Sequence, residues 1–500
     1  MFAFGSQILA LVRDRMLAHE FGAGVSLDIY YAAFRIPDLL YVLFASTLSV
    51  YVLIPFVARS REQNGTDSAK DFLSQIFSVF LIVYIVVAAG MMIAAPYLAG
   101  ILFPGIEDTE TLTMMMRVLL LQPLFLGISS LFGVITQLGH RFVLYALSPL
   151  IYNVGIIFGI AFLYPHVGLI GLAFGVVLGA IGHMLIQLPL VRSSALAFRF
   201  TTNFSKDLLQ KVLMVSIPRA LTLSLNQFVL LALASFASLM AVGSVSVFQF
   251  AYNLHSVPLS IIGVSYSVAA FPVLAELYAG NHFAKFKAHI LTVLRHIIFW
   301  SVPAIVLMVV LRAQLVRVLL GSGSFDWDDT RLTAAVLAIL ILGLAAQAIN
   351  LLVIRVFYAA GYTKIPFYII LLGSIIAILS SVGLMQIYGT SVAFQDMLAY
   401  IMRLRDVQGA EVLVLALGYT SAIILQSLCL LIAARKIFEI KLQPLLIPFC
   451  NACAAGLVGG VLAYASLNFL VEGINPNTFV GIFLQGFISG IVGLVGAVLT

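Results

Sequence analysis

Seven charged side chains crowd into 26 residues near the start of the chain, from Arg13 to Asp38. Guanidinium and carboxylate groups at such spacing can pair with each other or bind a polar ligand. They stand out because only 9% of the 500 residues are charged, whereas 62% are apolar. The seven residues are Arg13, Asp14, Arg15, Glu20, Asp28, Arg35 and Asp38. What they do depends on the elements that carry them, and on whether those elements lie in water or in a membrane.

The composition predicts a membrane protein built of helices. Mean hydropathy is +1.13, and apolar runs of about 20 residues are typical of transmembrane helices. The strands of outer-membrane barrels alternate in short segments instead. In such a chain a net charge of +6 indicates basic cytoplasmic loops rather than nucleic-acid binding. The fold class we expect is therefore an all-α polytopic membrane protein without a nucleic-acid partner.

Nothing in the sequence predicts a metal, a cofactor or an enzyme. Cys450 and Cys453 form a C-x-x-C spacing inside an apolar run, without nearby His or acidic residues. Small buried residues are therefore favoured there over a redox or metal site. Asp326, Asp328 and Asp329 lack the spacing of a calcium loop, so we expect a solvated outer loop. A nucleotide-binding P-loop is absent, so ATP hydrolysis is not the expected energy source.

Apolar runs predict about fourteen spans. They lie near residues 2–21, 29–57, 73–102, 112–138, 142–164, 167–191, 209–239, 244–275, 288–314, 332–359, 365–388, 412–434, 444–470 and 478–499. Several exceed the ~20 residues that a bilayer requires, so tilting or extension beyond the membrane is expected. The segment 390–411 is the one long outer loop. Its apolar residues Val392, Met397, Tyr400 and Ile401 suit a helix on the outer surface.

The loops predict the orientation. Lys and Arg gather after the even-numbered spans, at Arg59, Arg61 and Lys70; Arg141; Arg192, Arg199, Lys206 and Lys211; Lys285 and Lys287; Lys364; and Arg435, Lys436 and Lys441. Several of the other loops are acidic. Because basic loops stay on the cytoplasmic side, both chain termini are expected in the cytoplasm.

The charged stretch interrupts the first span. Phe2 to Val12 gives only about 16 Å of helix, so a crossing has to continue through Arg13, Asp14 and Arg15. Charges at that depth are costly unless they face a polar interior, which favours a water-filled cavity. For Arg35 and Asp38 the choice between a cavity and a salt-bridged outer rim stays open, because span 2 is long enough without them.

An internal repeat is suggested by two similar stretches, 30–58 and 250–275. Each has an aromatic and alanine entry, then Pro37 or Pro258, an apolar run, and then Pro55 or Pro272 with Ala three residues later. We expect two pseudo-symmetric six-helix lobes around a central cavity, 1–191 and 209–434, with two additional spans in 444–500. Duplicated halves that rock around a central site are a recurring transporter architecture.

The motifs of the first span resemble a known family. "GSQILALVRDRMLAHEFGAGVSLDIYYAAFRIPDLLYVLFASTLSVYVLIP" and "GSVSVFQFAYNLHSVPLSIIGVSYSVAAFPVLAE" are similar to the signatures of the MurJ/MviN lipid II flippases, members of the multidrug/oligosaccharidyl-lipid/polysaccharide exporter superfamily. The positions that match are Ser6, Arg13-Asp14, Phe21-Gly22, Gly24, Asp28, Ala33-Phe34, Pro37 and Pro55. The resemblance covers almost all of the chain.

The resemblance implies a site and a substrate. Such flippases move an undecaprenyl-diphosphate-linked peptidoglycan precursor from the inner to the outer leaflet of the bacterial cytoplasmic membrane. Ser6, Arg13, Asp14 and Asp28 would line the cavity, with Arg35 and Asn253 beside them. An Arg fork can bind diphosphate oxygens in a bidentate way. Spans 13 and 14 would form a groove for the prenyl tail, although generic helix packing explains their glycines equally well.

Departures from the family pattern concern its cations. Gln7 stands where the family usually has Arg, and Tyr41 or Val42 stands where a second Arg is usual. Ser46-Thr47 replaces Glu-Gly, and Tyr252-Asn253 stands where Asp-Arg is expected. Arg219 and Arg355 are candidates to replace the missing cations, although Arg355 could instead snorkel to the cytoplasmic surface. His255 is either a proton relay or a plain polar residue of the cavity.

A lipid II flippase working by alternating access is the leading hypothesis. Its partners would be the lipid-linked precursor, membrane lipids and cell-wall synthesis proteins. Export of another polyprenyl-diphosphate-linked glycan, a membrane enzyme acting on polyprenyl phosphate, and a non-transporting scaffold for cell-wall assembly are the alternatives.

Overall fold

The computed structural model describes residues 2–48, 50–471, 473–475 and 478–500, and they form two compact units. The N-terminal unit holds residues 1–17 and 24–239, and the C-terminal unit holds 18–23 and 240–500. These are packing units. They do not test the predicted internal repeat of 1–191 and 209–434, which stays a prediction.

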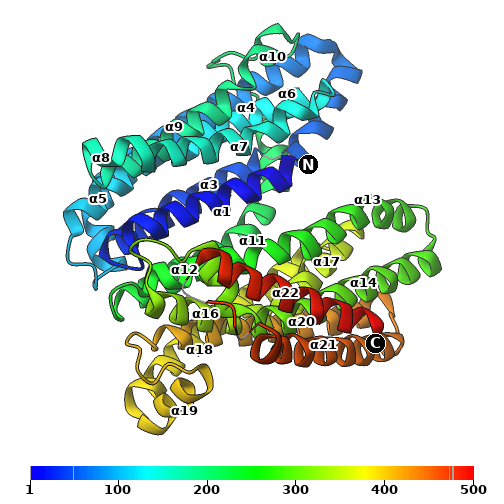
Figure 1. Ribbon diagram of the computed structural model, residues 1–500. Helices are drawn as coiled ribbons and strands as arrows, with labels where there is room; N and C mark the ends of the chain where they lie inside the picture. Colours follow the sequence, from blue (N-terminus) through cyan, green and yellow to red (C-terminus); the bar gives the residue numbers. More distant parts are fainter. Residues whose placement is uncertain (1, 49, 472, 476–477) are drawn as a thin grey trace. The chain divides into compact units, whose positions relative to one another are not determined.

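The N-terminal unit is helical in all its regular described elements (Figure 1). They are α1 (Phe2–Phe21, of which residues 18–21 are assigned to the C-terminal unit), α2 (Val25–Ala33), α3 (Arg35–Thr47), α4 (Val50–Leu102), α5 (Thr109–Leu119), α6 (Gln122–Leu138), α7 (Phe142–Phe158), η1 (Gly159–Leu163), α8 (Tyr164–Val167), α9 (Ile170–Leu185), α10 (Leu188–Ser193) and α11 (Lys206–Ser238). Within α4, Gly65 has φ 85° and ψ 176°, so this long element is two helices joined at a glycine that tolerates positive φ.

The C-terminal unit continues with helices. They are α12 (Ser244–Leu259), η2 (Ser260–Val264), α13 (Ser265–Ala279), α14 (Phe283–Val310), α15 (Arg312–Leu319), α16 (Trp327–Leu342), α17 (Leu344–Ala359), α18 (Lys364–Thr390), α19 (Val392–Met402), α20 (Val412–Phe438), η3 (Gln443–Leu445), α21 (Leu446–Ala465), η4 (Ser466–Leu470) and α22 (Phe479–Leu499). Phe286, Phe357 and Phe438 belong to its buried core, to which α13, α14, α17, α20 and α21 contribute.

The all-α membrane fold is confirmed. Among the described residues, eleven helices are long and apolar enough to cross a membrane, and the pair α16 and α17, bent by 44°, makes a twelfth span if it is counted as one. These twelve correspond to the predicted spans from 73–102 onward. The predicted number of about fourteen is compatible with this count and stays a prediction.

The two remaining predicted spans are the ones that carry the charged stretch. α1 is continuous from Phe2 to Phe21, through Arg13, Asp14 and Arg15. The second, 29–57, is divided among α2, α3 and the start of α4, with a break at Phe34. The break lies just before Pro37, whose ring clashes with the carbonyl of the preceding helical turn. In the C-terminal unit, the similar Pro258 precedes the π-helical turn η2 instead.

Glycines set the distance between α7 and α9, which lie side by side (Figure 1). A Cβ atom built on Gly155 would lie 2.2 Å from the Gly179 Cα, and one on Gly175 would lie 2.4 Å from the Gly159 Cα. Only hydrogen fits at these four positions, so the two backbones touch in the manner of small-xxx-small membrane helix pairs.

The C-terminal glycines that the sequence singled out also serve helix packing. A Cβ on Gly459 would lie 2.6 Å from the Gly493 carbonyl oxygen, which brings α21 against α22. A Cβ on Gly460 would lie 2.4 Å from Val306 of α14. The generic packing explanation is thus supported, and the prenyl groove stays a prediction.

Candidate functional site

Arg13 and Asp14 form a tight ion pair within α1. Arg13 donates from Nε and Nη2 to the same Asp14 oxygen, Oδ1, at 2.9 and 2.7 Å. The Asp14 side chain is 3% exposed and that of Arg13 is 21% exposed. Burial of a carboxylate is tolerated here because the guanidinium satisfies it through two charge-assisted hydrogen bonds.

Asn153 of α7 joins this pair to Ser6. Arg13 Nη1 donates to Asn153 Oδ1 at 3.3 Å, and Asn153 Nδ2 donates to Ser6 Oγ at 3.4 Å and to the Pro149 carbonyl at 3.0 Å. Three of the predicted site residues, Ser6, Arg13 and Asp14, are therefore brought together by a side chain 140 positions away in the sequence from Arg13.

A second part of the charged stretch lies on α2 and α3. Asp28 and Arg35 are buried, as is Gln122 at the start of α6. The Gln122 side chain hydrogen-bonds with the Asp38 carboxylate, and the charges of Arg35 and Arg13 act on the same carboxylate. We call Arg13, Asp14, Asp28, Arg35 and Asp38 the charged cluster. Within it Arg13 pairs with Asp14, and the charges of Arg35 and Arg13 act on Asp38, so its cations lie near buried or half-buried carboxylates.

The predicted site residues of the C-terminal unit lie on α12 and α17. Asn253 accepts a hydrogen bond from Gln249 Nε2 at 2.6 Å. His255, which is buried, lies with Nε2 3.2 Å from Gln347 Nε2. Arg355 donates to Ser267 Oγ and, at 3.4 Å, to the carbonyl of Val264. Arg355 thus contacts η2 and α13 of its own unit.

Two predicted residues contribute less. Gln7 lies half-buried on α1, and among the described residues no hydrogen bond is assigned to its side chain. The Arg219 side chain lies outside the described residues, although its backbone belongs to α11.

Asn153 and Gln122 are the residues that sequence reasoning did not place in the site. Both are amides within apolar runs of the sequence, at positions to which no role in the site was assigned. The usable signal is a polar side chain within an apolar helix, because such groups face the interior and seek partners there. That signal does not say which partner is found.

Acidic residues outside the spans hold turns and loops. Asp326 Oδ1 accepts from the Asp329 backbone N–H at 2.8 Å, and Asp329 Oδ2 accepts from the Ala23 backbone N–H at 3.0 Å. Within the described part of the chain, no group of three or more His, Cys, Asp or Glu residues is arranged to hold a metal ion. Asp326 thus caps the N-terminus of α16, and Asp329 links α16 to the residues that follow α1.

The long segment after α18 forms the predicted short helix. α19 spans Val392–Met402, and Val392, Met397, Tyr400 and Ile401 are exposed on it. Arg331 fixes the end of this segment, because its guanidinium donates to both oxygens of Asp406, at 2.7 and 2.6 Å. These hydrogen bonds lower the pKa of Asp406 to about 2.

Comparison with known proteins decides the family. A family model described as lipid II flippase MurJ matches residues 17–404. The chain belongs to the MurJ family. The probable lipid II flippase MurJ of Rhizobium tropici is 28% identical over 378 residues, which cover 72% of this chain and 70% of that protein. The one from Thermotoga maritima is 26% identical over 404 residues, covering 80% of this chain and 81% of that protein.

Solved structures agree on the fold. A lipid II flippase MurJ in an inward closed conformation superposes with a TM-score of 0.78, at 21% identity, covering 100% of this chain and 97% of that one. An inward-facing multidrug resistance MATE transporter of the MOP superfamily gives 0.70, at 15% identity, over 87% and 94% of the two chains. The sequence-based assignment to the MurJ/MviN family is confirmed, and this MurJ family member is a multi-pass membrane protein.

Proposed function

We propose that this MurJ family member is a lipid II flippase, which moves the undecaprenyl-diphosphate-linked peptidoglycan precursor from the inner to the outer leaflet by alternating access. Curated relatives over most of the chain carry that name. The single observation that carries the proposal is Arg13, an arginine in the middle of α1 that is held by a buried acid and an amide. Arginine in such a place is retained for function.

The geometry of Arg13 suits capture of a diphosphate. Three of its described hydrogen bonds go to Asp14 and Asn153, and a guanidinium has five N–H donors. The bond to Asn153, at 3.3 Å, is long. A phosphate oxygen can therefore take Nη1 from Asn153 without breaking the contact with Asp14, and the planar fork can bind two oxygens of the cargo.

Asp14, Asn153 and Ser6 position the guanidinium. Asp14 compensates its charge when no cargo is bound, so that the empty site does not hold an unpaired buried cation. Asn153 and Ser6 tie α1 to α7 through side chains that also offer hydrogen bonds to a phosphate or sugar. We place Asp28 and Arg35 in the same cavity, and Asn253, Arg355, His255, Gln7 and Arg219 among the residues that contact the rest of the head group.

Location and orientation follow from the same proposal. The protein resides in the bacterial cytoplasmic membrane with both termini in the cytoplasm, because the Lys and Arg residues gather after alternate spans. It acts as a transporter and not as an enzyme, with the lipid-linked precursor as its partner.

A second candidate, export of another polyprenyl-diphosphate-linked glycan, is favoured by one specific departure. Tyr252-Asn253 stands where the family resemblance expects Asp-Arg, and Asn253 is bound to another amide, Gln249. A cavity lined by fewer cations would suit a glycan that differs from that of lipid II but is linked to the same diphosphate.

Complementation tests the leading proposal. A bacterial host is depleted of its own lipid II flippase, this chain is expressed, and lipid II exposed on the outer leaflet is measured. We expect growth and lipid II exposure to be restored. No restoration by a well-expressed, correctly inserted protein would contradict the proposal, and selective export of another lipid-linked glycan would favour the second candidate.

Arg13→Ala is expected to abolish rescue, because the guanidinium that meets the diphosphate is lost. Arg59→Ala, an exposed arginine of α4, is the matched control and should be tolerated. Equal tolerance of both substitutions would remove Arg13 from the site while leaving rescue by the unmodified chain interpretable.

A further inference from the structure

Residues 439–445 connect α20 to α21 at the edge of the membrane. We call this connection the strap. It joins two helices that can each cross a bilayer. Phe438, Ile440 and Leu445 are buried in the core of the C-terminal unit. These three anchors fix the path of the residues between them, so the side chains that point outward are held in place without a ligand.

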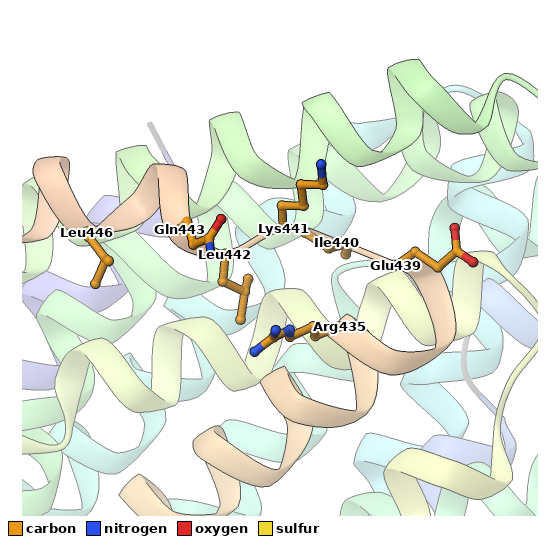
Figure 2. A pocket seen from close by; sticks show the side chains of 7 residues that line it. All are labelled: Arg435, Glu439, Ile440, Lys441, Leu442, Gln443 and Leu446. Atoms are coloured by element: carbon orange, nitrogen blue, oxygen red, sulfur yellow. The ribbon is translucent and has the colours of Figure 1, made fainter.

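A cavity of about 610 Å³ lies along this strap, which is within the range of small-ligand sites. Arg435, Lys441, Gln443, Leu442 and Leu446 are among its lining residues. Figure 2 shows the Arg435 side chain extending from α20 beneath Leu442 toward Leu446, while Lys441 projects from the other side of the strap.

The cavity carries excess positive charge. Its one acidic lining residue, Glu439, is paired with Lys287 at 3.2 Å. For Arg435 and Lys441 the described residues show no ion pair. Arg435 and Lys441 therefore remain to attract an anion, and Gln443 offers an amide beside them.

The cavity continues into an apolar surface. Leu446 and Ile447, in the first turn of α21, are 62% and 73% exposed, and Phe449 is 47% exposed. On α20, Ile432 is exposed as well. A ligand that fits has an anionic end for Arg435 and an apolar end that lies along the start of α21, which is the chemistry of a phospholipid.

We propose that this cavity binds the phosphate head group of an anionic phospholipid, with its acyl chains along Leu446, Ile447 and Phe449. Basic pockets between membrane helices are typical sites for such head groups. A bound lipid here stabilises the junction of α20 and α21. The site is separate from the charged cluster of the N-terminal unit, and it does not depend on the identity of the transported cargo.

A local fluorescence reporter tests this site. The full chain carries Phe449→Trp, with the native Trp300 and Trp327 replaced by Phe, and is reconstituted in nanodiscs of mixed phosphatidylglycerol and phosphatidylcholine. Bromine on the acyl chains of one lipid or the other quenches the reporter, which gives the relative affinity of the two lipids at this site. We expect the affinity of the site for phosphatidylglycerol to exceed its affinity for phosphatidylcholine by about tenfold, because two cations act on one head group.

The pocket variant Arg435→Gln/Lys441→Gln should bring this preference close to one. The matched control Lys285→Gln/Lys436→Gln removes the same charge from exposed neighbours that do not line the cavity, and it should keep the preference within about twofold. Circular dichroism and size-exclusion profiles verify that both variants fold.

Three results would overturn the proposal. The first is no preference in the unmodified pocket, and the second is an equal loss in pocket and control variants, which would indicate general surface charge. The third is abolition of the preference by inorganic phosphate at matched ionic strength, which would indicate a site for a small soluble anion.

Discussion

At the scale of residues, the pairing of Arg13 with Asp14 keeps a charged group inside an apolar helix. Both hydrogen bonds from the guanidinium end on one carboxylate oxygen, which fixes the orientation of the two side chains. Their opposite charges make the pair neutral. The sequence indicates this pair because the first predicted span would be too short to cross a bilayer if it ended before Arg13 and Asp14. It does not indicate Asn153, since which of many buried amides meets Arg13 is decided by how α7 packs against α1.

Breaking one side of the pair is expected to cost more stability than removing both. Asp14→Ala leaves the guanidinium without its counter-ion and should destabilise the protein by roughly 3 kcal/mol, the low end of the range for buried pairs because Arg13 is partly exposed. The double variant Arg13→Ala/Asp14→Ala should lose less. Thermal unfolding of the purified protein in detergent measures both changes. If the two single losses simply added up in the double variant, the side chains would not act as a pair.

At the scale of elements, hydropathy located the spans well and their interruptions poorly. Twelve predicted spans correspond to described helices or helix pairs long and apolar enough to cross a membrane, since about 20 apolar residues in a row leave few alternatives. Pro37 indicates a kink in 29–57, and the structure divides this stretch further, among α2, α3 and α4. Pro37 and Pro258 look alike in sequence, yet one follows a break and the other precedes a π-helical turn, because neighbouring helices decide how each proline is accommodated.

Gly175→Ala is expected to destabilise the protein by about 1–3 kcal/mol, because the added methyl group would collide with the Gly159 backbone and push α9 from α7. The control is Gly100→Ala in α4, where nothing lies within 4 Å of the new methyl group. It should be neutral or slightly stabilising, since alanine is the better helix former. Apparent melting temperatures in detergent compare the two. A Gly175→Ala protein as stable as Gly100→Ala would show that the helices separate easily.

At the scale of the whole molecule, the family and the all-α class were predictable, and the arrangement of the site was not. A run of specific residues from Ser6 to Pro55 carried the resemblance to the family, and the family model matches residues 17–404. Hydrogen bonds such as those that join α1 to α7 depend on packing across the chain and have no local signature. Orientation in the membrane is a prediction at this scale, drawn from the sum of Lys and Arg residues in the loops.

Labelling of single cysteines checks the orientation. In a protein without its three native cysteines, Asp396→Cys on α19 should react with a membrane-impermeant maleimide in intact spheroplasts. Asn203→Cys, in the basic segment before α11, should react only after permeabilisation. Both positions are exposed, so accessibility alone does not separate them. The reverse pattern would invert the topology.

The neutrality of the Arg13–Asp14 pair has a consequence for the energy that drives transport. The pair itself carries no net charge, so the membrane voltage does no work on it when the empty carrier resets. A dianionic diphosphate held against it adds its own charge, and the voltage, negative inside, contributes about 2.3 kcal/mol per elementary charge for each 100 mV in the outward direction. The membrane voltage would then favour the outward movement of the loaded carrier through the charge of the cargo.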